Sequence, residues 1–261
     1  MSFQRLLIEL RELRELLRAG VRRRLYHPPP GAGRRYDWRR RLAGYDPSAL
    51  LRTPLMDARF VMLDTETTGL EAYGGDEIVE IALLEYHGLE PTGREFWSRV
   101  DPGIPVPPES TAIHGIGDAD VAGAPHLDTV MERILPFIDD AVLVGHHIAF
   151  DLRFLNRAIR RIVHRQLPHP AINTMTLYQA WTGQLGHHAL GEVASACNVP
   201  LHDRHSARGD AVICGSIFRY LAPRLLAGDA TVADLLAVAP PAPEYGPGNA
   251  PDSGPHPPGT H

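Results

Sequence analysis

The sequence has no lysine, two cysteines and no long hydrophobic run. The cysteines, Cys197 and Cys214, form no CxxC pair, so they do not indicate a disulfide framework and instead fit small buried side chains in a reducing compartment. No segment approaches the ~18 apolar residues of a membrane-spanning helix. Arg and Glu interrupt the apolar residues near the N-terminus, which excludes the hydrophobic region of a signal peptide. We therefore expect a cytoplasmic protein with no membrane partner.

All 26 positively charged side chains are arginines, and they are distributed unevenly. Residues 1–59 carry 14 arginines and 6 acids, whereas residues 60–261 carry 12 arginines and 25 acids, and the formal net charge is −5. The absence of lysine reflects either genomic base composition or a functional preference for arginine. An acidic body with a basic arm is still able to bind phosphate groups if metal ions neutralise its site locally.

The first 53 residues fall into two segments that precede the predicted main domain. Residues 1–25 are predicted to form an amphipathic N-terminal helix, because apolar side chains recur every three or four residues over 3–18. This helix either docks on the body or forms a dimer or partner contact through residues 3–18. Residues 26–53 are predicted to be an Arg- and Pro-rich linker. Its arginines and interleaved aromatic residues either track a nucleic-acid strand or belong to a solvated linker whose aromatics pack on the domain.

The remaining chain predicts one α/β domain and a tail. Three strand-like segments joined by short turns predict an antiparallel meander, and alternating helices and a strand follow, so we expect a mixed β-sheet flanked by helices over residues 54–226. The predicted strands are 59–64, 78–86, 95–100 and 141–145, and the predicted helices are 129–139, 147–161, 174–181, 189–197 and 210–226. Residues 227–261 are predicted to hold a short helix and a disordered tail, because the last 22 residues contain eight prolines and four glycines.

The stretch FVMLDTETTGL, residues 60–70, places two acids at the end of an apolar strand. Asp64 and Glu66 point to the same side, because side chains alternate along a strand. An ionised carboxylate is costly to desolvate unless a cation compensates it. The stretch therefore indicates either a surface turn or a metal site. Gly69 permits a tight turn that would bring backbone N–H groups near a bound group.

Two later segments also place polar residues beside apolar ones. In VGHHIAFDLRFL, residues 144–155, Asp151 falls in the first turns of a helix among apolar neighbours, although a solvent-facing Asp is also favoured near a helix N-terminus. In HDRHSARGDAVICGSIFRYL, residues 202–221, His205 precedes Asp210 by five residues, which turns the two side chains apart on a continuous helix. They converge only if His205 lies on the loop before the helix.

Taken together and in this order, these residues resemble the three motifs of the DEDDh (DnaQ-like) 3′–5′ exonuclease superfamily. The motifs are DTETTGL, HHIAFDLRFL and HSARGD, and the segments AIHGI and HHALGEVASACNVP are similar to further family segments. The resemblance spans residues 55–225 and is greatest to proofreading (epsilon) subunits of bacterial replicative polymerases and their stand-alone relatives. It implies a ribonuclease H-like fold and makes residues 54–226 an exonuclease domain. In one departure, His147 stands where the family usually has Asn.

The resemblance also implies roles for the polar residues. Two divalent metal ions, Mg²⁺ or Mn²⁺, would be held by the four carboxylates. Asp64 would bridge both ions, Glu66 and Asp210 would complete one, and Asp151 would hold the other, partly through water. His205 would be the general base that deprotonates the attacking water, because the pKa of an imidazole lies near working pH.

The expected substrate is the 3′ end of a nucleic-acid strand. The residues expected to bind it are Thr67, Thr68, Gly69, Leu70, His114 and His147. A DNA proofreading or repair exonuclease, an exoribonuclease acting on RNA or short oligonucleotides, and an inactive nucleic-acid- or polymerase-binding module all remain open. The presence of all four acids argues against the inactive module. The expected partners are single-stranded DNA and a polymerase or other replication or repair protein.

Overall fold

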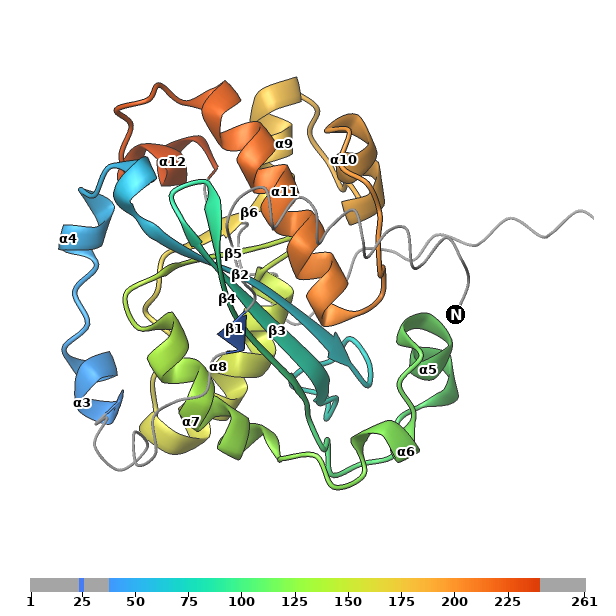
Figure 1. The fold of residues 1–261 in the computed structure, drawn as a ribbon. Helices are drawn as coiled ribbons and strands as arrows, with labels where there is room; N and C mark the ends of the chain where they lie inside the picture. The colour runs from blue at the N-terminus through green and yellow to red at the C-terminus, as the bar shows by residue number, and fades with distance from the viewer. Residues whose placement is uncertain (1–23, 26–37, 240–261) are drawn as a thin grey trace, which may run out of the picture.

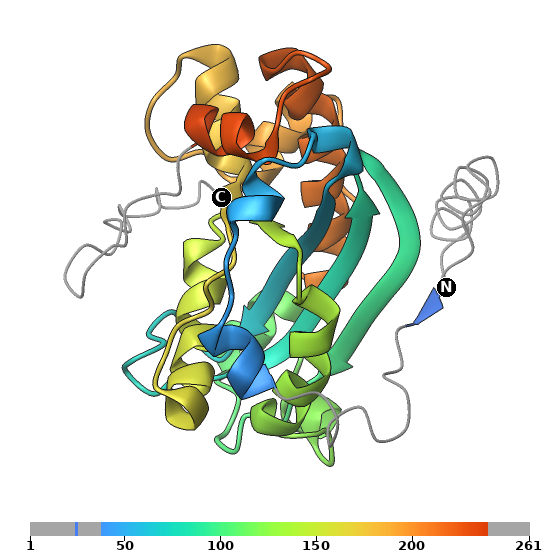
Figure 2. The same ribbon diagram turned by 90° about the vertical axis from the view of Figure 1, so that its left-hand side faces the viewer.

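The computed structural model describes residues 24–25 and 38–239 (Figure 1). These residues form a mixed β-sheet with helices on both faces, which Figure 2 shows from the side. The strands are β1 (Arg24–Leu25), β2 (Arg59–Thr67), β3 (Ile78–His87), β4 (Glu90–Arg99), β5 (Val142–Gly145) and β6 (Ala171–Asn173). Their order is β1-β4-β3-β2-β5-β6, with antiparallel pairs at β2–β3 and β3–β4 and parallel pairs elsewhere. The predicted meander and mixed sheet are confirmed.

The helices agree with prediction where they are long. The bounds are α3 (Trp38–Ala43), α4 (Ser48–Leu51), the 3₁₀ helix η1 (Leu55–Asp57), α5 (Pro108–His114), α6 (Asp118–Val121), α7 (Leu127–Ile138), α8 (Ala149–Val163), α9 (Thr174–Thr182), α10 (Leu190–Ala196), α11 (Ala207–Leu225) and α12 (Val232–Val238). The five predicted helices correspond to α7, α8, α9, α10 and α11. The sequence pattern does not predict α5, α6 and β6. With 4 and 3 residues, α6 and β6 are too short to show a periodicity, and α5 buries only Ser110, so it shows no apolar pattern.

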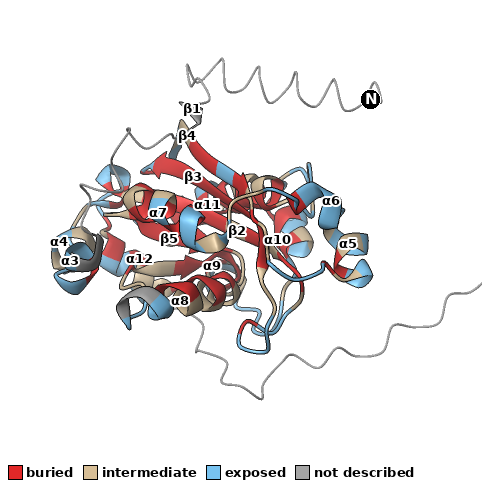
Figure 3. Ribbon diagram, turned by 90° about the horizontal axis from the view of Figure 1, so that it is seen from below, coloured by how far each residue is buried: buried red, intermediate tan, exposed pale blue. Residues whose placement is uncertain are grey.

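The two faces of the sheet carry two separate apolar layers. On β2, Phe60 and Met62 pack on the side of α9, α10, α11 and α12, whereas Val61 and Leu63 pack on the side of α7 and α8. This alternation follows from the twofold periodicity of a strand. Figure 3 shows the central strands almost entirely buried between the helices. A strand covered on both faces reads as a continuous apolar run, as β2 does before Asp64.

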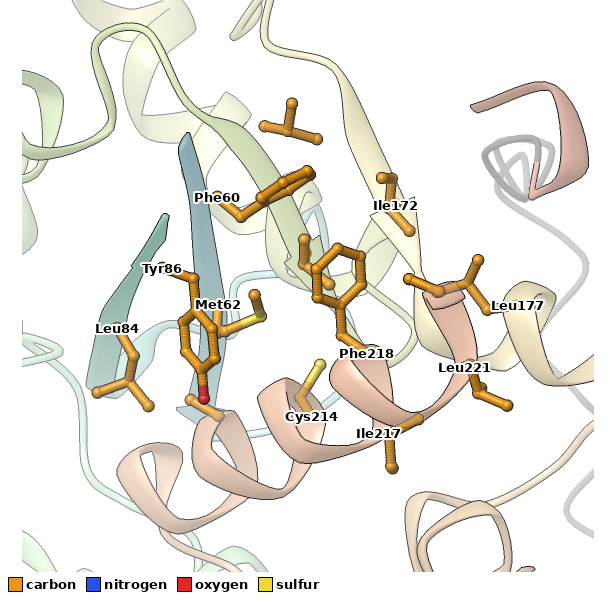
Figure 4. Packing of buried hydrophobic residues seen from close by; sticks show 14 of the residues in the cluster. Phe60, Met62, Leu84, Tyr86, Ile172, Leu177, Cys214, Ile217, Phe218 and Leu221 are labelled. Atoms are coloured by element: carbon orange, nitrogen blue, oxygen red, sulfur yellow. The ribbon is translucent and has the colours of Figure 1, made fainter. Parts of the chain in front are cut away.

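Helix α11 lies directly against β2 and β3 (Figure 4). The ring of Phe218 packs on Phe60 with a centroid distance of 4.9 Å. Gly215 faces Tyr86, and a Cβ atom at this glycine would overlap the tyrosine hydroxyl group. The close approach fixes the height of α11 above the sheet, and thereby places its first turn over the end of β2.

The predicted linker over residues 26–53 contains two short helices, α3 and α4. Leu42 of α3 is buried in the layer that contains α7 and α8, and Leu50 and Leu51 of α4 pack against the opposite layer. α3 buries one leucine and α4 only partly covers two, so their apolar residues show no periodic pattern in the sequence. The described part of this segment is therefore packed on the domain.

The segment after residue 226 also packs on the domain. The predicted short helix is present as α12, and its residues Val232 and Leu235 are buried in the α11 layer. The Val232 amide donates to the Thr53 carbonyl over 3.1 Å, and the Leu55 amide donates to the Ala230 carbonyl over 2.8 Å. The start of the predicted domain is thus hydrogen-bonded to the segment that follows its predicted end.

Some predictions fall on residues outside the described ranges. The amphipathic helix over 3–18 and the disordered tail over 240–261 are among them. Arg24 and Leu25 pair with β4, so the prediction of a helix through residue 25 is wrong at these two residues, where strand pairing overrides the local pattern.

The expectations from composition have simpler outcomes. Cys197 and Cys214 are both buried and carry free thiols, as expected. Among the described residues, no helix combines the length and apolar character needed to span a membrane.

We expect Phe218→Ala to lower the free energy of unfolding by about 3–5 kcal/mol, because it leaves a cavity at the contact between α11 and the sheet. Arg219→Ala, one residue along on the exposed side of α11, is the matched control and should change stability by less than about 1 kcal/mol. Urea unfolding followed by circular dichroism measures both. Equal losses in the two variants would contradict the packing described here.

Candidate active site

The first two acids lie on one face at the carboxyl end of β2. Asp64 pairs across the sheet with Ala82 of β3, and Glu66 pairs with Glu80. Both acids continue the row of Phe60, so they point to the side on which α11 packs. The strand extends three residues beyond its predicted end, because its pairing with β3 continues to Thr67. The expectation that the two carboxylates share a face is confirmed.

Asp210 joins these acids from the first turn of α11. One carboxylate oxygen from each of Asp64, Glu66 and Asp210 lies within 4.8 Å of the others. The Oδ2 atom of Asp210 accepts a hydrogen bond from Arg204 over 2.6 Å, whereas its Oδ1 atom is buried without a hydrogen-bond partner. The structure therefore brings together three of the four predicted metal ligands.

Asp151 approaches the same three acids from α8. It lies in the first turn of that helix, is 3% exposed, and accepts a hydrogen bond from the Thr65 hydroxyl over 2.6 Å. Its charge raises the pKa values of both Asp64 and Glu66, which places it beside them. A buried aspartate beside two other acids supports the metal-site alternative over a solvent-facing residue.

The surroundings of the four acids favour either protonation of the carboxyl groups or binding of cations to the carboxylates. Burial, followed by the charges of the other acids, raises the pKa of Asp64 well above its usual value and the pKa of Glu66 to about 8. Burial raises the pKa of Asp151 to about 7 and also raises that of Asp210. The positive charge of Arg204 opposes these shifts at Asp64, Glu66 and Asp210. Like charges in a desolvated cluster cannot all ionise without a compensating cation.

His205 lies on the loop before α11, as its spacing from Asp210 requires. The side chain of Ser206 caps the helix by accepting the Gly209 amide over 3.1 Å. A Cβ atom at Gly209 would overlap the carbonyl group of Asp203, so only glycine lets the loop fold back on the helix. His205 itself has a left-handed backbone with φ of 60°. Non-glycine residues in this conformation carry a small energetic cost and cluster at functional sites.

The turn after β2 is held by α5. The Thr67 hydroxyl donates to the Gly69 carbonyl over 2.6 Å, and the Thr68 amide donates over 2.9 Å to the carbonyl of Glu77, just before β3. Ser110 of α5 donates to the Thr68 carbonyl over 2.7 Å. Three of the residues expected to bind the 3′ end thus belong to one rigid turn, and α5, which the sequence does not predict as a helix, supports it.

His114 at the end of α5 lies against the same turn. Its Nδ1 atom accepts the Ile116 amide over 3.1 Å, so its Nε2 atom carries the proton and donates to the Thr67 carbonyl over 3.2 Å. Burial lowers the pKa of His114, which keeps this neutral tautomer. Leu70 in the turn is 73% exposed. The structure therefore places His114 beside the turn and leaves the leucine side chain available for contact.

The two histidines of the second motif have different surroundings. His146 is half-buried, and it donates through Nε2 to the His188 carbonyl and accepts at Nδ1 from Thr174, each over 2.9 Å. Burial lowers its pKa to about 3, so it is a neutral structural residue. The ring of His147 stacks on His187 with a centroid distance of 4.7 Å, and its backbone φ is 58°. His147 thus joins the second motif to the loop before α10.

Glu80 is a fifth acid of the region, one that sequence reasoning did not assign to the site. It is 2% exposed and accepts hydrogen bonds from the Ala207 amide over 2.8 Å and from the Trp97 indole over 2.7 Å. It also lies 3.5 Å from a guanidinium nitrogen of Arg99. Glu80 therefore attaches the first residue of α11 to β3, next to Glu66. Its sequence signal was an acid inside the otherwise mostly apolar run IVEIALLEY, which holds a second acid at Glu85.

A family model described as exonuclease (RNase_T) matches residues 61–218. The chain belongs to this exonuclease family. A DNA polymerase III subunit epsilon-like protein of Rhodobacter capsulatus is 40% identical over 183 residues, which cover 69% of this chain and 26% of the relative. A PolC-type DNA polymerase III of Halalkalibacterium halodurans is 32% identical, over 70% of this chain and 12% of the relative. The exonuclease domain thus spans about a quarter or less of the length of these relatives.

Solved structures show the same fold. Exonuclease X, in complex with 5′ overhanging duplex DNA, has a TM-score of 0.51 at 23% identity, over 67% of this chain and 98% of that protein. Exonuclease I of E. coli, in complex with a dT13 oligonucleotide, has a TM-score of 0.53 at 15% identity, over 64% of this chain and 42% of that protein. The expected ribonuclease H-like sheet and the resemblance to DnaQ-like 3′–5′ exonucleases are confirmed.

The acids of the exonuclease domain fit divalent cations. Hard ions such as Mg²⁺ and Mn²⁺ prefer carboxylate oxygens, and the cluster offers at least one oxygen from each of three acids within 4.8 Å. The buried, unpartnered Oδ1 atom of Asp210 is a natural ligand for such an ion. Asp151, whose charge raises the pKa of Asp64 and of Glu66, adds a fourth carboxylate beside this cluster.

Two further site residues, Arg204 and His187, carry no distinctive sequence signal. Arg204 is one arginine among many, and only its position next to His205 distinguishes it. His187 comes to His147 through the fold of the loop between α9 and α10, a contact that spans 40 residues and that local sequence patterns cannot reveal. Both depend on tertiary structure.

We expect the exonuclease domain to lose thermal stability as the pH rises from about 5 to 8 with EDTA present. A carboxyl whose pKa is higher in the folded protein contributes most to stability below its unfolded pKa, and this contribution is lost as the pH rises through the folded pKa. For Glu66 the window runs from 4.5 to about 8. Mg²⁺ favours the ionised carboxylates and should remove the decline.

Melting temperatures across this pH range, with EDTA and with Mg²⁺, measure the effect. The variant Glu66→Gln separates the acid cluster from other titrating groups, because it should flatten the profile in EDTA. The same decline in all three conditions would show that the cluster is not responsible.

Proposed function

We propose that this protein hydrolyses DNA from its 3′ end by a two-metal-ion mechanism in which His205 is the general base. Membership of the exonuclease family supplies the reaction class. The two-metal mechanism is supported by one observation. Asp64, Glu66 and Asp210 converge within 4.8 Å, with Asp151 and the His205 loop beside them. This chemistry uses four acids and one histidine, and the chain supplies them from five separate positions.

In this mechanism the acids would hold and orient the metal ions, and the histidine would take a proton from the attacking water. Two divalent ions held by Asp64, Glu66, Asp151 and Asp210 would neutralise charge on the attacking and leaving oxygens of the phosphodiester. His205 takes the proton of the attacking water on its imidazole ring. The charge of His205 lowers the pKa of Asp210 and of His114, which supports a position between the acid cluster and α5.

The terminal nucleotide would bind at the turn formed by residues 67–70. Leu70 is 73% exposed, and Ile113 of α5, next to His114, is 62% exposed. Exposed apolar side chains on both sides of the turn fit a nucleobase, because every base has an apolar face. Thr67 and Thr68 use their side chains within the domain, so their contribution to binding would come from the backbone.

DNA is favoured over RNA as the substrate by the relatives. Exonuclease X and exonuclease I were solved with DNA, and the most similar relatives reported above are named as replication proteins. The same names support association with a polymerase. A role of residues 3–18 in dimerisation or partner binding is a separate proposal that deletion of these residues would test.

We expect purified protein with Mg²⁺ or Mn²⁺ to release nucleoside 5′-monophosphates from the 3′ end of single-stranded DNA. Strands labelled at the 3′ or 5′ end, in DNA and RNA versions, distinguish polarity and substrate. Asp64→Asn should abolish release, and Asp229→Asn, an exposed acid far along the chain, is the matched control. Faster degradation of RNA would transfer the proposal to an exoribonuclease, and no degradation of any strand would overturn it.

We expect His205→Ala to lower kcat by about 10²–10⁴-fold, which is the usual contribution of general-base catalysis, with Mn²⁺ affinity unchanged. His87→Ala, at the exposed end of β3, is the control for loss of a histidine. Turnover from single-stranded DNA and Mn²⁺ titration by electron paramagnetic resonance give the two quantities. Unchanged turnover would remove His205 from the mechanism.

A further inference from the structure

We infer that Trp97 and Arg99 of β4 form a second nucleotide-binding subsite, in which the indole stacks on a base and the guanidinium binds a phosphate of the substrate strand. The inference deepens the proposed function and rests on it. It assigns a role to the outer strand of the meander, which neither the motifs nor the proposed mechanism uses.

Strand register places Trp97 on the catalytic face. Asp64 of β2 pairs with Ala82 of β3, and Ala82 pairs with Trp97 of β4. Directly paired residues point to the same side of a sheet, and adjacent strands are ~4.8 Å apart, so Trp97 lies roughly 10 Å from the Asp64 position. Its neighbour Phe96 points the other way into the core. The indole thus lies on the same face of the sheet as the acids, about two strand spacings from Asp64.

Arg99 lies two residues beyond Trp97 on β4 and on the same face of the sheet. Glu66 pairs with Glu80, and Glu80 pairs with Arg99. The charge of Arg99 lowers the pKa of His114, which places the guanidinium near the α5 side of the site. Arg99 therefore lies between the proposed 3′-end turn and Trp97, at the end of the sheet where the acids are.

The Trp97 ring is held in place while much of it stays accessible. The side chain is 42% exposed, which is unusual for the largest apolar residue. Its indole nitrogen donates a hydrogen bond over 2.7 Å to the buried Glu80. Because this bond already orients the ring, stacking of a base would cost the side chain little further conformational freedom. A preoriented, half-exposed aromatic ring beside a nuclease site is the element that single-strand-binding proteins use for base stacking.

The Arg99 guanidinium has donor capacity left for a ligand. Its Nη1 atom is buried 3.5 Å from Glu80, so the donors open to a ligand are those on the exposed part of the side chain. About a third of its side chain, 32%, is exposed. A guanidinium carries five N–H donors and suits phosphate recognition better than an ammonium group does. Its carbon Cζ is 5.8 Å from the Trp97 ring centroid, so one nucleotide is able to contact both.

The test measures how affinity depends on the length of the strand. Fluorescein-labelled oligothymidylates of two to eight nucleotides are titrated by anisotropy with Mg²⁺, in the His205→Ala background to slow hydrolysis. We expect affinity to rise with length in this parental protein, and Trp97→Ala to weaken binding of the eight-nucleotide strand by about 5- to 150-fold, the range for one lost base–aromatic stack. Trp97→Phe should retain most of the affinity. Trp181→Phe, a second half-exposed tryptophan on α9, is the matched control.

Salt dependence tests the arginine separately. Loss of one phosphate contact should reduce the slope of log affinity against log salt by about 0.7 in Arg99→Ala, with partial recovery in Arg99→Lys. Arg208→Ala, whose arginine pairs with Glu95 over 3.1 Å, is the control. Melting temperatures show which variants remain folded, and Trp97→Phe keeps the test valid if Trp97→Ala does not.

The same length dependence and salt slope in parental and variant proteins would overturn the subsite. Failure of the proposed function is recognised differently. If wild-type protein releases no nucleotide from any strand, the exonuclease proposal fails, while the anisotropy titrations still show whether Trp97 and Arg99 contact the strand.

Discussion

The close packing of α11 on β2 and β3 determines where the acids of this protein meet. Phe218 and Gly215 set the height of the helix over the sheet, and Glu80 fixes its first residue. Asp210 and the His205 loop follow from that position, because both belong to the start of α11. An error of one helical turn would move Asp210 by ~5.4 Å, more than the span of the cluster. The geometry of the site is therefore a consequence of the core.

The electrostatics of the site oppose the stability of the fold. Burial of four acids in one region raises their pKa values, and Arg204 offsets only part of the effect. His205 and His147 add left-handed backbone conformations near the same cluster. Such costs are tolerated because two apolar layers enclose the sheet and hold the local structure in place. The domain thus concentrates unfavourable charge and left-handed backbone conformations around the acid cluster.

The sequence alone predicted the sheet, the long helices and the convergence of motifs, but not the residues that support them. Asp64 and Glu66 were predictable because strand periodicity fixes their common face, and Asp151 and Asp210 because of their place in ordered motifs. By contrast, α5 buries only Ser110 and so shows no apolar period, and the short helices between residues 38 and 51 bury too few leucines to reveal one. Contacts such as His147 with His187 and Glu80 with Ala207 join distant residues, so local sequence patterns contain no information about them.

The hydrogen bonds that join residues 53–55 to residues 230–232 have a consequence for modularity. They bring the first and last elements of the exonuclease fold side by side, so the fold closes on itself. A domain whose ends are adjacent can be inserted into a longer chain with little disturbance to either partner. This geometry is compatible with the occurrence of similar domains as about an eighth to a quarter of much larger proteins. A domain of this kind can therefore form part of proteins whose other domains differ widely.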